Sequence, residues 1–160
     1  MGKPIIKYRK SDLYDQVVDE YDVFASSYDF LIFLAVVGYR ENRLKQNNYT
    51  GDRDEGTRGE IGLQNVYSND LYRTIMACLA LQESGNPDAL VDSSTQMQVL
   101  AQYAAGGLEV AEQEFGDIAG DPTDAIVNYI ERLHEDNPAP GGELDAIVKS
   151  FDDEMLNTEE

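Results

Sequence analysis

The sequence has little cysteine and histidine, and these shortages exclude several kinds of site. One cysteine and one histidine are present among its 160 residues, and tryptophan is absent. A single cysteine cannot form an internal disulfide, and Cys78 with Leu71, Ile75 and Leu79 is predicted to form the inward face of a helix, so we expect a small buried thiol. A zinc site needs three or four spaced ligands, which Cys78 and His134 cannot supply. We expect no metal site, and we place His134 at the surface end of a helix.

Catalytic and nucleotide-binding signatures are also missing. The segment 51–56 lacks the Gly-Lys-Ser/Thr ending of a P-loop, and no Gly-x-Ser-x-Gly elbow is present. A Ser-His-Asp site could use only His134. Carboxylates are so abundant that a cluster such as Glu109, Glu112 and Glu114 is expected by chance, as a solvated face. The sequence therefore indicates a protein that is not an enzyme and binds no cofactor.

Long hydrophobic runs are absent as well. The longest apolar stretch, residues 30–38, is well short of the roughly 20 residues that span a membrane. The N-terminus has a lysine at its third position and lacks the apolar core of a signal peptide. A chain of 160 residues with 42% hydrophobic residues suits one globular domain. We therefore expect a cytoplasmic protein that makes no membrane contact.

Acidic residues are in large excess. The chain has 31 Asp and Glu against 12 Lys and Arg, a formal net charge of −19. In dilute buffer this charge destabilises the folded state by self-repulsion, whereas salt at about 1 M shortens the screening length to roughly 3 Å. We interpret the acidity as an adaptation to a salt-rich cytoplasm. The alternative is a functional acidic surface, such as a DNA mimic or inhibitor that uses residues 109–160.

The charge is unevenly distributed along the chain. Residues 1–60 have nine Lys or Arg and eleven Asp or Glu, a net charge of −2, whereas residues 61–160 have three and twenty, a net charge of −17. An anionic partner is therefore expected to contact the first third. The candidates for contact with nucleic acid or a partner are Arg40, Arg43, Lys45, Arg53 and Arg58, with Lys3, Lys7, Arg9 and Lys10 nearby in the sequence. Salt bridges to the protein's own acids are the alternative role.

Apolar periodicity predicts an all-α fold, a small bundle of six helices. The predicted helices cover residues 12–21, 27–44, 69–84, 93–115, 122–134 and 143–156, with a helical turn at 87–91. We predict a basic extended arm over residues 1–10, a single helical domain over 11–156, a frayed acidic tail over 157–160, and one short extended segment near 60–67. Gly38, Gly106 and Gly107 are assigned structural roles, in close helix packing or, for the glycine pair, in a kink.

Three stretches together resemble one family. They are Phe24–Phe30 running into Ala35–Arg40, then Tyr103–Val110, then the closing helix pair. In order and spacing, from about residue 8 to residue 134, the chain is similar to the small accessory proteins of DNA phosphorothioation (Dnd) gene clusters, the fourth Dnd-associated family, in the form expected of a halophilic archaeon. The resemblance implies an accessory part of a system in which sulfur replaces a non-bridging phosphate oxygen of DNA. It brings no catalytic residue with it.

The resulting hypothesis is a non-enzymatic adaptor of a phosphorothioation-linked modification or restriction defence system, which acts through contacts with other proteins of that system. A direct DNA-binding subunit that uses the basic N-terminal third is one alternative. The acidic DNA mimic or inhibitor is the other. The segment after Pro138 lies outside the resemblance.

Overall fold

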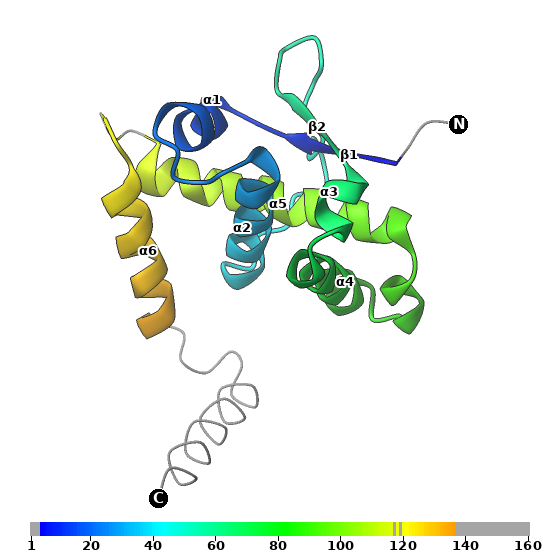
Figure 1. The fold of residues 1–160 in the computed structure, drawn as a ribbon. Coiled ribbons are helices and arrows are strands. Elements are labelled where there is room, and N and C mark those ends of the chain that lie inside the picture. The colour runs from blue at the N-terminus through cyan, green and yellow to red at the C-terminus, as the bar shows by residue number, and fades with distance from the viewer. Residues whose placement is uncertain (1–3, 117, 119, 137–160) are drawn as a thin grey trace, which may run out of the picture. The chain divides into compact units, whose positions relative to one another are not determined.

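The structure is a computed structural model that describes residues 4–116, 118 and 120–136. Its elements are β1 (Ile5–Arg9), α1 (Asp12–Tyr14), the π-helix η1 (Asp15–Glu20), α2 (Ser27–Arg40), β2 (Arg58–Gly62), α3 (Leu63–Tyr67), α4 (Asp70–Ser84), the 3-10 helix η2 (Pro87–Leu90), α5 (Ser93–Phe115) and α6 (Thr123–Asp136) (Figure 1). The chain divides into two compact units, the first ending at Pro122 and the second beginning at Thr123. The prediction of a mostly helical protein is confirmed, and a two-stranded antiparallel sheet is added to it.

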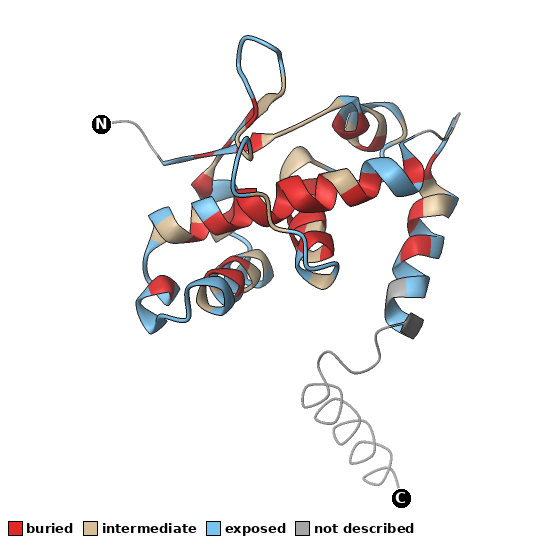
Figure 2. Cartoon of the chain, turned by 180° about the vertical axis from the view of Figure 1, so that it is seen from behind, coloured by how far each residue is buried: buried red, intermediate tan, exposed pale blue. Residues whose placement is uncertain are grey.

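The long helix α5 is the centre of the first unit. Every residue from Val99 to Leu108 is buried, and Figure 2 shows this stretch as a continuous buried band. A helix buried on all sides needs neighbours on all sides, and α2, α4, η2 and β1 contact it. Its predicted bounds are confirmed. It begins where the side chain of Asp92 accepts hydrogen bonds from the backbone N–H groups of Ser94 and Thr95.

Helices α2 and α5 cross at glycines. A Cβ atom added at Gly38 would lie 3.0 Å from the backbone nitrogen of Gly107, and one added at Gly107 would lie 3.0 Å from that of Gly38. The same atoms would overlap the carbonyl oxygens of Tyr103 and Leu34. Since α5 is one uninterrupted helix, its glycine pair does not break it. The missing side chains instead let the two backbones approach closely.

β1 and β2 form an antiparallel ribbon that packs on α5. Alternate side chains of the ribbon face inward, where Ile6, Tyr8 and Ile61 are buried. The ring of Tyr8 lies 5.2 Å from that of Tyr14, centroid to centroid. It also covers Gly59, where any added Cβ would overlap it. Residues 5–9 of the predicted arm are therefore a strand anchored in the core, whereas residues 1–3 lie outside the described residues.

The segment predicted to be extended over 60–67 is extended only as far as Gly62. From Leu63 onward the prediction is wrong, because the chain forms α3, which buries Leu63 and Val66. The backbone N–H of Leu63 donates to the carbonyl oxygen of Pro4 at 3.0 Å, so the hydrogen bond that follows the ribbon also fixes the start of the helix. A helix this short shows too little periodicity to be told from a strand.

Helix α2 ends at Arg40, earlier than its apolar stripe predicts. A Schellman motif stops it: the N–H of Arg43 donates to the carbonyl of Gly38 at 2.7 Å, and that of Asn42 donates to the carbonyl of Tyr39 at 3.2 Å. Asn42 supplies the left-handed residue of the motif, with a φ of 56°. The chain therefore leaves the axis of α2 at this point.

The C-terminal predictions divide between described and undescribed residues. The helix predicted over 122–134 is α6, and His134 is exposed near its end, as expected. The helix predicted over 143–156 and the tail predicted over 157–160 lie outside the described residues.

Helix α4 also matches its prediction. Gly85 ends it in the left-handed conformation with a φ of 68°.

Candidate interaction surfaces

Arg43 and Lys45, two of the predicted contact residues, are bonded to α5. Nζ of Lys45 lies 2.6 Å from Oε1 of Glu109, and Nη1 of Arg43 lies 3.8 Å from Oε2 of the same carboxylate. The backbone N–H of Lys45 donates to the carbonyl of Gln102 at 3.1 Å, and the carbonyl of Arg43 lies against Gly106. The α5 residues Gln102, Gly106 and Glu109 are spaced four and then three apart, so one stripe of the helix holds all these contacts. We call residues 43–45 the anchored segment.

Arg58 braces the loop that precedes β2. Its Nε donates to the carbonyl oxygen of Thr50 at 3.1 Å, and its Nη2 donates to that of Gly51 at 3.3 Å. Gly51 has a φ of 67°, and an added Cβ would overlap the carbonyl of Thr57. Both acceptors of Arg58 are neutral, so they hold the guanidinium group in place without cancelling its charge.

The other two predicted contact residues occupy separate positions. Arg40 is the last residue of α2 and is half-buried. Arg53 is exposed in the loop before β2 and has an acidic residue on each side in the sequence. The five predicted cations therefore come from the end of α2, the anchored segment, the loop and β2, and the carboxylate of Glu109 brings Arg43 and Lys45 together.

The outer side of the ribbon carries cations that the sequence analysis placed in the basic arm without assigning them to a face. The residues that alternate with the buried ones are Ile5, Lys7, Arg9, Arg58, Glu60 and Gly62. We call this set the ribbon face. Within the described residues, no carboxylate forms an ion pair with Lys7, Arg9 or Arg58. In the sequence, the ribbon face is indicated by the alternation of Lys7 and Arg9 with two apolar residues. This strand pattern is too short to predict a strand by itself.

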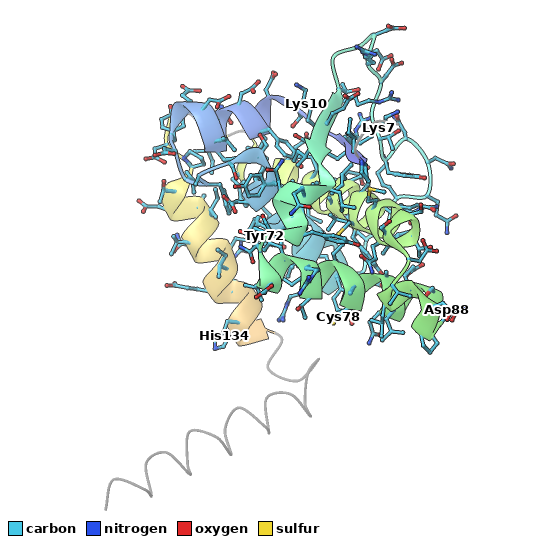
Figure 3. All side chains as sticks on the ribbon, turned by 45° about the vertical axis from the view of Figure 1, so that its right-hand side comes forward. Lys7, Lys10, Tyr72, Cys78, Asp88 and His134 are labelled. Atoms are coloured by element: carbon cyan, nitrogen blue, oxygen red, sulfur yellow. The ribbon has the colours of Figure 1, made fainter. Side chains whose placement is uncertain are left out.

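Cys78 is exposed, so the prediction of a buried thiol is wrong (Figure 3). Helix α4 buries Met76 and Leu79, whereas Leu71, Ile75 and Cys78 lie on its other side. Leu71 is 64% exposed and Ile75 is half-buried. Both sides of the helix are apolar, so the periodicity of the sequence cannot decide which of them meets the core. We call Leu71, Ile75 and Cys78 the α4 outer face.

Two tyrosine–carboxylate hydrogen bonds fix the rotation of α4. The hydroxyl of Tyr72 in α4 donates to Oδ1 of Asp29 in α2 at 2.5 Å, and that of Tyr103 in α5 donates to Oε2 of Glu83 in α4 at 2.8 Å. Burial, reinforced by the carboxylate, raises the pKa of Tyr72 to about 12. Burial and the carboxylate of Glu83 raise the pKa of Tyr103 to about 12 in the same way. Both hydroxyls therefore remain donors at neutral pH.

Two other kinds of site, a metal centre and a membrane-spanning helix, are not found among the described residues. Across this part of the chain, no three His, Cys, Asp or Glu side chains are grouped so that they could hold a metal ion. None of the described helices is both long enough and apolar enough to cross a membrane. The features that stand out on the described surface are therefore the ribbon face and the α4 outer face.

Comparison with protein families assigns the chain to a family. The family model described as DNA sulphur modification system-associated protein 4 matches residues 7–148. The chain belongs to this family. The resemblance to the fourth Dnd-associated family is thereby confirmed, and it associates the protein with a DNA sulphur modification system. No curated protein and no solved structure matches the chain.

The family match includes both surfaces. It begins at Lys7 of the ribbon face and extends past α6, so the anchored segment and the α4 outer face lie within it. The family match therefore spans the whole described fold from the third residue of β1 onward, and of the two surfaces it leaves out Ile5 alone.

Proposed function

We propose that the protein is a non-enzymatic adaptor of a DNA sulphur modification system and acts through contacts with other proteins of that system. Membership of the family supports the association with such a system. The observation that carries the adaptor role is the α4 outer face, an apolar stripe on a helix whose opposite side is packed in the core.

The α4 outer face has the properties of a protein contact. Leu71, Ile75 and Cys78 are spaced four and then three residues apart, so they lie on one side of the helix. Two further apolar side chains, Leu90 at 46% exposure and Val91 at 87%, follow in and after η2, which packs on α4. Single exposed apolar residues need no explanation. A stripe of them at helical spacing favours the insertion of the helix face into a partner's groove.

The helix that carries this stripe is held rigidly. The Tyr72–Asp29 and Tyr103–Glu83 hydrogen bonds join α4 to α2 and α5. A preorganised surface loses little conformational entropy on binding, so more of its contact energy contributes to affinity. The same hydrogen bonds prevent α4 from rotating to bury its outer face, because rotation would break both of them.

Partner capture from cells with an intact sulphur modification gene cluster tests the proposal. We expect the wild-type protein to recover a protein of the system and the Leu71→Glu/Cys78→Glu variant to lose it. The matched control is Val127→Glu, which changes another exposed apolar residue, on α6. Recovery of no system protein by the wild type would contradict the adaptor role. Full recovery of the partner by the double variant would show that the partner contacts a surface other than the α4 outer face.

We also propose that the acidic surface is an adaptation to a salt-rich cytoplasm, as in a halophilic archaeon. With 31 acids and 12 cations, most carboxylates cannot have a cationic partner, so repulsion between them opposes folding in dilute buffer. We expect the free energy of unfolding by urea to rise between dilute buffer and 2 M KCl. Equal stability in the two solutions would contradict the adaptation and leave the acids without an explanation.

A further inference from the structure

The ribbon face groups three cations that have no acidic partner within the described residues, a property that Lys10 and Arg53 share. Arg43 and Lys45 share Glu109, and Arg73 pairs with Asp70 at 3.4 Å. By contrast, the three cations of the ribbon face form no ion pair within the described residues. Acids outnumber cations 31 to 12 along the chain, so a shortage of acids does not explain the difference.

The register of the ribbon places two of these cations opposite each other. Arg9 pairs with Arg58 across the strands, whereas Lys7 is opposite Glu60. Like charges at directly opposite positions destabilise an antiparallel pair. An external anion that binds between the two arginines would convert this repulsion into attraction.

Arg58 is already oriented for such an anion. The carbonyl groups of Thr50 and Gly51 accept two of its N–H bonds and fix the plane of the guanidinium group. Because less side-chain freedom remains to be lost, binding to Arg58 costs less entropy than binding to a free arginine. The acids of the loop, Asp52, Asp54 and Glu55, precede β2 in the chain, so they border the ribbon face at its Arg58 end without being part of it.

We propose that the ribbon face binds the phosphate backbone of duplex DNA. Lysine and arginine are the side chains that contact phosphate, and a two-stranded ribbon has the dimensions that the major groove admits. Contacts to phosphate carry no sequence information, so binding through the phosphate backbone is independent of sequence. This inference goes beyond the adaptor function, which requires the α4 outer face and not the ribbon.

The contact is weak and works as a second point of attachment. Three phosphate contacts give a logarithmic salt slope of at most about −2.7, and the acidic remainder of the chain repels DNA. In a salt-rich cytoplasm such a contact is too weak to hold the protein on DNA by itself. If a DNA-bound partner holds the adaptor, tethering raises the effective concentration of the ribbon face near the duplex.

Fluorescence anisotropy with a labelled duplex, in a titration of KCl upward from 50 mM, tests the proposal on the full chain. We expect Lys7→Gln/Arg9→Gln to lower the affinity at least about tenfold and to reduce the steepness of the salt slope by about 1.8. The matched control, Arg43→Gln/Lys45→Gln, makes the same change in net charge and should bind like the wild type. Glu60→Gln removes the acid of the ribbon face and should bind more tightly.

Three results would overturn the proposal. One is no binding by the wild type at 50 mM KCl. Another is an equal loss of affinity in the two double variants, which would show an effect of net charge alone. The third is unchanged DNA affinity of Lys7→Gln/Arg9→Gln with loss of partner capture, which would make the ribbon face a protein contact. Thermal unfolding of each variant confirms that the fold is intact.

Discussion

The anchored segment and the ribbon face each contain a lysine and an arginine two residues apart, and the fold gives the two pairs opposite settings. Arg43 and Lys45 meet Glu109, which lies 64 residues beyond Lys45 in the chain. Lys7 and Arg9 project from a strand whose intervening residue is buried, and no acid of the described residues pairs with them. The role of a surface cation is therefore decided by the tertiary neighbour that faces it.

The largest expected effect comes from a matched pair of glycine substitutions, one in each region. A Cβ at Gly106 would lie 2.7 Å from the carbonyl carbon of Arg43, so Gly106→Ala should displace the anchored segment. We expect a loss of about 1–3 kcal/mol in the free energy of unfolding, despite the better helix propensity of alanine. In the ribbon, a Cβ at Gly62 would lie at an ordinary 3.6 Å from Nδ2 of Asn65, so Gly62→Ala should be neutral. Urea denaturation of both variants measures the difference, and equal stabilities would remove the basis of the comparison.

A smaller effect is expected from the tyrosine bonds that hold α4 against α2 and α5. Tyr103→Phe removes the donor to Glu83 and should cost about 1 kcal/mol, because the bond is charge-assisted but partly exposed. The control is Tyr49→Phe, whose hydroxyl has no hydrogen-bond partner within the described residues and whose backbone carbonyl binds β1. If the control is the more destabilised variant, the tyrosine bonds do not secure α4.

The contribution of the Tyr103–Glu83 hydrogen bond should also appear in the stability of the wild-type protein at alkaline pH. The pKa of Tyr103 is raised from its ordinary value of 10.0 to about 12 in the folded state. A raised pKa means that the stabilisation is complete below pH 10 and is lost as the pH rises toward 12. Urea denaturation between pH 9 and 12 should therefore show a smaller fall for Tyr103→Phe than for the wild type. An equal fall would contradict the assignment.

The smallest expected effect is the change in stability when one acid of each region, Glu109 or Glu60, is replaced by glutamine. Glu109→Gln keeps the shape of the side chain but leaves Arg43 and Lys45 without their carboxylate, which should cost about 0.5–1 kcal/mol because the ion pairs are partly exposed. Glu60→Gln removes an acid that has no ion-pair partner in the described residues, and the stability should change by less than about 0.5 kcal/mol. Thermal denaturation at low salt resolves the two, and the reverse order of effects would break the comparison.

The sequence predicts the helices well where their caps and periodicity are strong. The bounds of α5 follow from Asp92 as its N-cap and a long apolar stripe, and the end of α4 follows from Gly85. The sequence fails for α3, which is too short to show a period. It also fails for Cys78, because both sides of α4 are apolar and the rotation of the helix depends on hydrogen bonds to residues of α2 and α5.

The candidate site was less predictable than the fold, because it too depends on contacts between residues that are distant in the sequence. Charge asymmetry along the sequence directs attention to the first 60 residues. It cannot separate Arg43, which faces an acid on α5, from Arg9, which faces Arg58 across a ribbon. That separation requires the pairing of two strands about 50 residues apart in the chain, which local pattern does not encode.

Amide chemical shifts of the isotope-labelled protein, followed by NMR during addition of duplex DNA at low salt, test the central claim most directly. The distinction between the two pairs of cations predicts that the shifted amides fall in residues 5–9 and 58–62, while those of the anchored segment and of Glu109 stay in place. Shifts centred on Arg43 and Lys45, with the ribbon unaffected, would contradict the assignment of roles.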